Sequence, residues 1–139
     1  MNWFWWSLLS ALFAAATAIL AKTGLATTDS NTATAVRTSV ILVLAWVIVL
    51  ATTGMATVRQ LSSSALIPLV MSGITTGLSW LCYFRALQLG PASKVAPIDK
   101  LSVVFVVPLA AIFLNEPVTL RIGLGIGLIA AGAFVLASK

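Results

Sequence analysis

The sequence predicts an all-α integral membrane protein with five transmembrane helices, on three observations. Hydrophobic residues make up 60% of the chain and charged residues only 8%. Soluble domains carry about 25% charged residues, so this chain has too little polar surface for water. The mean hydropathy is +1.11. Five apolar stretches are each close to the length of about 20 residues that crosses a bilayer, and they cover about residues 3–21, 33–53, 65–89, 94–114 and 118–138. Because the connections are short, we treat residues 1–139 as a single transmembrane domain.

The first stretch opens with the aromatic run Trp3–Trp6. Such a cluster is typical of the aromatic belt that anchors a helix at the membrane interface. No basic segment precedes it, as a secretory signal peptide would require. The polar connection that follows Lys22 ends in three residues that can each cap the second helix, namely Asp29, Ser30 and Asn31.

Small residues mark faces on which helices can approach one another closely. The third stretch carries Gly73 and Gly77, and the fifth carries Gly123 and Gly127, each pair four residues apart. This spacing is typical of helix packing in membranes. We therefore expect these four glycines to lie at helix–helix contacts.

Glycine and proline define the ends and irregularities of the fourth helix. Gly90 and Pro91 break the chain between the third and fourth stretches. Pro97 suits the first turn of the fourth helix, where no N–H is needed. Pro108 lies deep inside that helix, where the missing N–H frees a carbonyl and predicts a kink.

The composition argues against several kinds of chemistry. Cys82 is the single cysteine and histidine is absent, so the sequence predicts no disulfide, no metal site and no cofactor. No serine–base pair or metal-ligand set stands at catalytic spacing, so we do not expect an enzyme. The eight basic residues are scattered between the apolar stretches, so nucleic acid is not an expected partner.

Five antiparallel helices would place most charges at one side of the membrane. That side receives Lys22, Asp29, Arg37, Arg85, Lys94, Asp99, Lys100 and Lys139, and the other receives Arg59, Glu116 and Arg121. One interpretation is that the cations are topology signals that extend from helix ends to the interface. The other is that some of them form a functional site.

Four of these residues, Arg37, Arg85, Asp99 and Lys100, have similar predicted depth within about two helical turns of the interface. A lone carboxylate among apolar neighbours needs a partner. Because Asp99 and Lys100 are adjacent and point about 100° apart on a helix, we expect the partner of Asp99 on another helix, as Arg37 or Arg85. The prediction is a polar cluster at the mouth of a cavity.

Aromatic side chains near this layer are candidates for the cavity lining. Trp80, Tyr83 and Phe84 can offer ring faces and one hydroxyl to an amphipathic ligand, although an interfacial belt explains them equally well. Asp99 and Glu116 are the acidic groups that could carry a coupling proton. Glu116 is also explained as an anion near the start of the fifth helix.

Three sequence motifs resemble those of the EamA domain of the drug/metabolite transporter superfamily. They are WLCYFRALQLGPASKVAPI at residues 80–98, LNEPVT at 114–119 and GxxxGLIAAG at 123–132. The resemblance extends over essentially the whole chain. Most members carry two such five-helix units related by inverted pseudo-symmetry, whereas this chain has one and resembles the single-domain branch.

The resemblance implies a secondary transporter in the bilayer of a prokaryotic cell (inner) membrane. It implies that a homodimer moves a small organic metabolite or amphipathic molecule by alternating access. The related small multidrug efflux proteins rely on a glutamate in the first span, and this sequence has no acidic residue there. The alternative from a different class is a non-transporting membrane subunit that scaffolds or regulates a partner protein.

The charge distribution leaves the relative orientation of two copies open. All Lys and Arg residues together count six against two, which favours an N-terminus outside and a C-terminus inside. Without the deeper cations Arg37, Arg85, Lys94 and Lys100, the count is two against two. Balanced connections would permit insertion in both orientations, and the inverted symmetry of the family favours an antiparallel pair.

Overall fold

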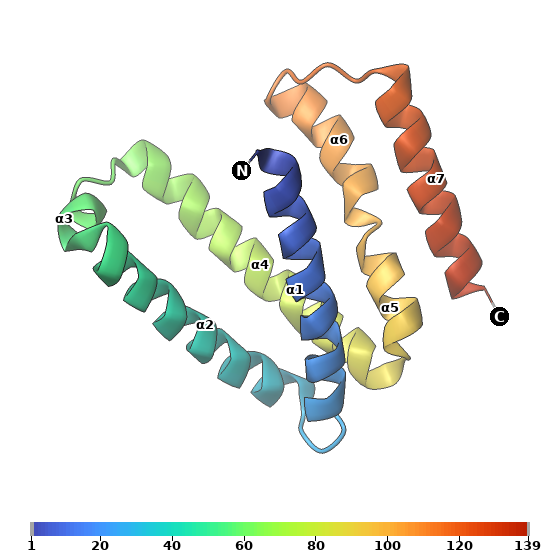
Figure 1. The fold of residues 1–139 in the computed structure, drawn as a ribbon, viewed down its shortest axis with the longest axis horizontal. Helices are drawn as coiled ribbons and strands as arrows, with labels where there is room; N and C mark the ends of the chain where they lie inside the picture. Colours follow the sequence, from blue (N-terminus) through green and yellow to red (C-terminus); the bar gives the residue numbers. More distant parts are fainter. Residues whose placement is uncertain (1, 139) are drawn as a thin grey trace. The chain divides into compact units, whose positions relative to one another are not determined.

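The computed structural model describes residues 2–138, and in that range it consists of helices and connections without β-strands. Lys139, which the sequence predicts to be a topology signal, lies outside the described residues. The helices are α1 Trp3–Gly24, α2 Ser30–Thr52, α3 Gly54–Arg59, α4 Ser63–Leu89, α5 Ala92–Asp99, α6 Ser102–Phe113 and α7 Leu120–Ala137 (Figure 1). Within residues 2–138, five helical segments are long and apolar enough to cross a membrane, with α5 and α6 counted together. The predicted class, an all-α membrane unit of five spans, is confirmed.

The chain forms two compact units, which we describe separately. The first unit contains the residues up to Leu20 together with those from Leu89 onward, and the second unit contains Ala21–Gln88. The first unit therefore holds most of α1 with α5, α6 and α7. The second unit holds the end of α1, then α2, α3 and nearly all of α4.

In the second unit, α2 begins at Ser30 because Asp29 caps it. Oδ2 of Asp29 accepts hydrogen bonds from the backbone N–H groups of Asn31 at 2.9 Å and Thr32 at 3.1 Å. Of the three caps that the sequence allowed, Asp29 is confirmed. The cap satisfies backbone donors that have no partner within the helix.

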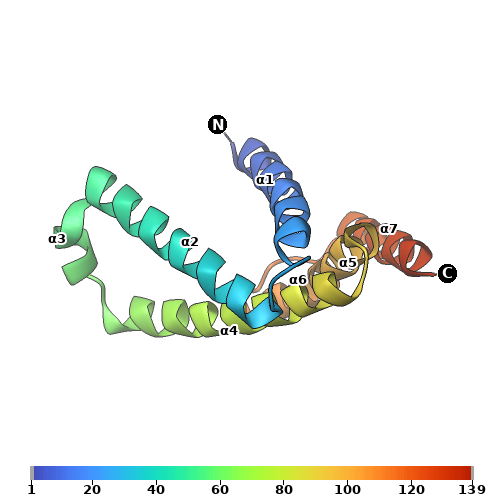
Figure 2. The same cartoon turned by 90° about the horizontal axis from the view of Figure 1, so that it is seen from below.

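The core of the second unit lies where the start of α2 meets the end of α4. Its buried residues are Leu25, Ser30, Thr34, Phe84 and Leu87. From this end the two helices diverge toward α3 (Figure 2). The core thus fixes one end of the α2–α4 pair.

The last turn of α1 and the α1–α2 connection are both hydrogen-bonded to the end of α4. Nζ of Lys22 donates to the backbone oxygen of Leu87 at 2.5 Å, and Nε2 of Gln88 donates to that of Thr28 at 3.5 Å. The carbonyls at a helix C-terminus lack intrahelical partners and favour a nearby cation. Lys22 therefore stabilises the end of α4, which holds the aromatic residues of the candidate site.

The short helix α3 was not predicted, since the sequence indicated only a connection after residue 53. Gly54 has a φ of +73°. Glycine adopts this left-handed conformation without the steric cost of a Cβ atom. The chain can therefore turn directly from α2 into the short helix α3, which ends at Arg59.

In the first unit, α7 packs along α5 and also contacts α6. Nζ of Lys94, at the start of α5, donates to the backbone oxygen of Ser138 at 3.1 Å. This bond joins the end of α7 to the beginning of α5. The two helices are therefore held together at the end of the unit that carries both groups.

The fourth span has an interruption that was not predicted. Helix α5 ends at Asp99 and α6 begins at Ser102, whereas α6 continues through Pro108. Pro97 is also not in the first turn, because α5 begins at Ala92. The prediction for Pro97 was wrong, whereas a kink at Pro108 stays a prediction. The interruption is visible between α5 and α6 in Figure 1.

The hydrogen bonds around Lys100 show how the interruption forms. The N–H of Lys100 is shared between Ala96 O at 3.3 Å and Pro97 O at 3.2 Å. The N–H of Leu101 then bonds Ile98 O at 3.0 Å, and that of Val104 bonds Leu101 O at 2.9 Å. Apart from the bond to Ala96 O, these contacts reach back three residues, so the chain tightens from α-helical to 3₁₀ geometry.

Candidate functional site

Arg37 lies in the second turn of α2 and faces two aromatic residues of α4. The centre of its guanidinium is 4.2 Å from the ring centroid of Trp80 and 5.3 Å from that of Phe84. Trp80 and Phe84 are four residues apart, so they lie on the same face of α4. Phe84 is buried, whereas Arg37 and Trp80 are half-buried. The geometry is that of a cation–π interaction.

Tyr83 lies next to this group. Its ring packs edge-to-face against Phe84, with centroids 6.3 Å apart and planes at 69°. It is also close enough to Arg37 for an electrostatic interaction. The structure thus brings together Arg37, Trp80 and Tyr83 of the predicted site, with Phe84 beneath them. We call these four residues the Arg37 aromatic group.

Arg85 is exposed and is bonded along its own helix. Its Nη1 donates to Oε1 of Gln88 at 2.7 Å, and Gln88 in turn donates to Thr28 O. Sequence reasoning missed Gln88, although its spacing of three residues from Arg85 is one at which helical side chains meet. Arg85 is therefore linked through Gln88 to the α1–α2 connection.

Asp99 pairs with its neighbour Lys100 at the interruption of the fourth span. Nζ of Lys100 lies 3.3 Å from Oδ2 of Asp99. The expectation that their directions on a regular helix would keep them apart does not hold here. Since the helix ends at Asp99, the long lysine side chain is not confined to helical spacing.

The predicted four-residue cluster draws on both units. Arg37 and Arg85 belong to the second unit, whereas Asp99 and Lys100 belong to the first. A contact of Asp99 with either arginine therefore stays a prediction.

Glu116 lies in the connection between α6 and α7. It is exposed and stands four residues before Leu120, where α7 begins, while the hydroxyl of Thr119 caps that helix. Its explanation as an anion near the start of the fifth helix stays a prediction. The preceding Asn115 has a φ of +55°. The connection is thus a tight turn that presents Glu116 outward.

The four glycines of the predicted packing faces lie against open space. A Cβ atom placed at Gly73, Gly77, Gly123 or Gly127 meets no atom within 4 Å among the residues that the structure describes.

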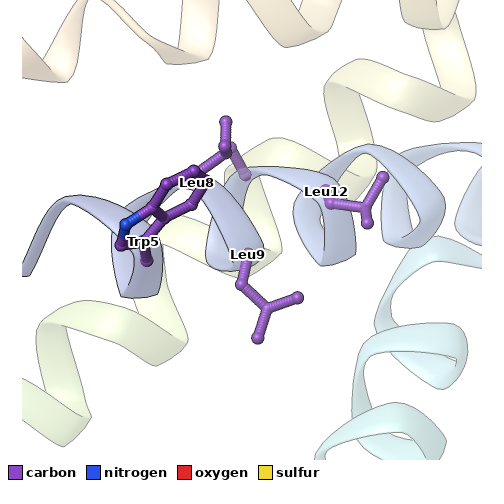
Figure 3. A pocket seen from close by; sticks show the side chains of 5 residues that line it. Trp5, Leu8, Leu9 and Leu12 are labelled. Atoms are coloured by element: carbon purple, nitrogen blue, oxygen red, sulfur yellow. The ribbon is translucent and has the colours of Figure 1, made fainter. Parts of the chain in front are cut away.

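An apolar hollow of about 440 Å³ lies against α1, lined by Trp5, Leu8, Leu9, Ala11 and Leu12 (Figure 3). Since a single helix lines this hollow, it is an exposed apolar face rather than an enclosed cavity.

No group of three or more His, Cys, Asp or Glu side chains within residues 2–138 is arranged to hold a metal ion.

Five apolar spans with cationic and aromatic side chains near the helix ends define an integral membrane protein with contact to the lipid bilayer. Residues 1–138 match the EamA-like transporter family, and the chain belongs to that family. It is 48% identical over 136 residues to a protein of Sinorhizobium sp described as an uncharacterized transporter in the cobO 3′ region, which covers 98% of this chain and 96% of the relative. No solved structure matches the chain. These similarities assign a transporter role.

Proposed function

We propose that the protein is a secondary transporter of a small organic molecule and works as a homodimer by alternating access in a prokaryotic cell membrane. The observation that carries this proposal is that a Cβ atom added at Gly73, Gly77, Gly123 or Gly127 would meet no atom within 4 Å among the described residues. A membrane transporter needs helices around a shared path, and paired units are a common solution. The Sinorhizobium relative is consistent with a prokaryotic membrane.

The glycine faces support pairing because another helix can approach closely where no Cβ atom stands. Gly123 and Gly127 lie on one face of α7, and Gly125 lies on the opposite face of the same helix. This arrangement supplies a matched pair of substitutions that differ only in direction.

The test of pairing compares Gly127→Leu with Gly125→Leu in native membranes. We expect Gly127→Leu to reduce chemical cross-linking to a dimer and Gly125→Leu to leave it near the level of the unchanged protein. The two positions are matched in that a Cβ atom at either one meets nothing within 4 Å among the described residues. Equal cross-linking in both variants, or only monomers at every concentration with transport retained, would refute the proposed dimer.

The two copies in this proposal are antiparallel. Reporters fused to the C-terminus, one active outside the cell and one inside, test this orientation. Signals from both reporters are expected. A signal from only one side would refute the antiparallel arrangement while leaving a parallel dimer intact.

The proposed transport is tested with the purified protein in sealed liposomes. Uptake of radiolabelled carboxylates, amino acids and amphipathic compounds should be saturable for at least one compound and absent from protein-free liposomes. A folded, dimeric protein without saturable uptake of any compound would favour the alternative, a membrane subunit that regulates a partner.

A further inference from the structure

The charges of the second unit identify Arg37 as a residue with an unusual environment. The acidic residue of this unit, Asp29, uses its carboxylate to cap α2. Lys22 donates to Leu87 O and Arg85 donates to Gln88. Among the residues that the structure describes, none accepts a hydrogen bond from the guanidinium of Arg37.

The aromatic contacts of Arg37 occupy only part of its binding capacity. A guanidinium carries five N–H donors in its plane, and stacking on a ring engages the flat face of that plane. Trp80 and Phe84 therefore hold the group in place while its N–H edges stay available. A cation over an aromatic face gains at most a few kcal/mol when desolvated, so a charge this far inside a span still favours an anionic partner.

We propose, on the basis of the transporter role above, that the Arg37 aromatic group binds the anionic end of an organic substrate. Arginine recognises carboxylate and phosphate by two parallel N–H···O bonds, which its planar fork fits better than a lysine does. The aromatic rings offer an apolar surface to the body of the same molecule. The substrate class is an organic anion with a carboxylate or phosphate and an apolar portion.

A lipid headgroup phosphate has the same recognition chemistry as a free organic anion. The proposal commits to the free anion, because Phe84 is buried and the guanidinium is held against α4 by two rings rather than extended along the helix surface. The experiment must nevertheless separate the two sources.

Trp80 provides a direct reporter of this group. In a variant with Phe at positions 3, 5, 6 and 46, Trp80 is the remaining tryptophan of the chain. The probe is the anion of 4-nitrophenylacetic acid, a carboxylate whose nitro ring quenches tryptophan emission. Para-nitrobenzylamine, which carries the same ring with a positive charge, is the control. The protein is held in nanodiscs of phosphatidylcholine.

We expect saturable quenching by the carboxylate, and only weak, unsaturable quenching by the amine. Arg37→Gln should weaken the apparent affinity for the carboxylate by about tenfold or more, because a hydrogen bond to a charged group is lost. The apparent affinity of Arg37→Lys should lie between those of the unchanged protein and Arg37→Gln, since lysine keeps the charge but lacks the planar pair of N–H donors. Arg59→Gln, which removes an exposed cation from the same unit, should leave the affinity unchanged.

Circular dichroism and thermal unfolding confirm that each variant is folded before its affinity is compared. Quenching that is equal for both probes, or that does not change in folded Arg37→Gln, would overturn the proposal. A second set of nanodiscs, in which phosphatidylglycerol replaces half of the phosphatidylcholine, tests for a lipid occupant. If saturable, Arg37-dependent quenching disappears in these nanodiscs, while Arg59→Gln in phosphatidylcholine alone keeps it, the occupant is a lipid headgroup. That result would overturn the substrate assignment.

The binding assay and the transport assay have independent outcomes, so each can refute its own hypothesis. Arg37-dependent binding without uptake of any compound would refute the transporter function and keep the anion site. Saturable uptake without Arg37-dependent binding would keep the transporter function and refute the anion site.

Discussion

Asp99→Asn removes the carboxylate that lies at the interruption of the fourth span. In the structure this carboxylate pairs with Lys100 at 3.3 Å, and the side chains of Asp99 and Lys100 are 36% and 63% exposed. An ion pair with that exposure contributes about 0.2–1 kcal/mol. Loss of one member of a buried pair would instead cost about 3–5 kcal/mol. The measured loss of stability therefore distinguishes a local pair from the buried cluster that the sequence predicts.

We expect Asp99→Asn to lower the free energy of unfolding by no more than about 1 kcal/mol and to abolish transport. The stability term follows from the exposed pair. The loss of transport is expected because the proposed alternating access requires helices to move, and the fourth span is discontinuous at Asp99 and Lys100. Arg59→Gln is the control and should change neither quantity.

The assay is equilibrium unfolding in mixed micelles as SDS is titrated, combined with uptake into liposomes. A double-mutant cycle of Asp99→Asn with Lys100→Gln should give a coupling energy of about 0.2–1 kcal/mol. Parallel cycles with Arg37→Gln and Arg85→Gln test the predicted partners on α2 and α4. If Asp99→Asn keeps both stability and transport rate, Asp99 is only a helix-end anion and the reasoning fails.

Two further predictions concern the local structure that positions the site. Asp29→Ala should lower the free energy of unfolding by about 1 kcal/mol, since two N–H groups lose their acceptor, while Asn31→Ala should have little effect; equal effects in SDS titration would contradict the cap. Asn115→Ala should destabilise the protein by about 1 kcal/mol or more, because alanine tolerates the left-handed conformation poorly, and Asn115→Gly should not, so an equal loss in both variants would exclude the backbone explanation.

The spans could be predicted from the sequence because lipid imposes a simple rule. A helix that crosses the bilayer needs about 20 apolar residues, and charged or polar residues separate such stretches clearly. The interruption of the fourth span could not be placed in the same way. Pro97 and Pro108 each remove one backbone donor, and the sequence favoured an irregularity at Pro108, because Pro97 fitted the first turn of the helix.

The structure indicates which property decided between those positions. The chain is interrupted beside Asp99 and Lys100 and stays helical through the apolar run around Pro108. Unpaired backbone groups are costly in hydrocarbon, so an irregular turn is tolerated best where polar side chains already occur. A comparison of the polarity around each proline would have favoured the position after Pro97.

The candidate site was predictable in its residue types and less so in its contacts. Arg37, Trp80 and Tyr83 were named from depth and chemistry, and the structure brings them together. The bonds of Lys22 to Leu87 O and of Lys94 to Ser138 O were not predicted. Each of these bonds spans more than forty residues of chain. Such contacts depend on how helices pack, and helix packing leaves no periodic signal in the charges themselves.

These contacts also separate the two interpretations of the cationic layer. A lysine or arginine that only marks topology needs no fixed acceptor, because it extends to the interface. Several cations of the layer instead have specific acceptors in the protein, namely Lys22, Arg85, Lys94 and Lys100. Their positions are thus explained by helix ends and by an ion pair. Arg37 differs, since two rings hold it within a span and no acceptor among residues 2–138 engages its donors. The rings explain the position of the Arg37 guanidinium but leave its N–H donors unengaged, and the proposed anion would engage them.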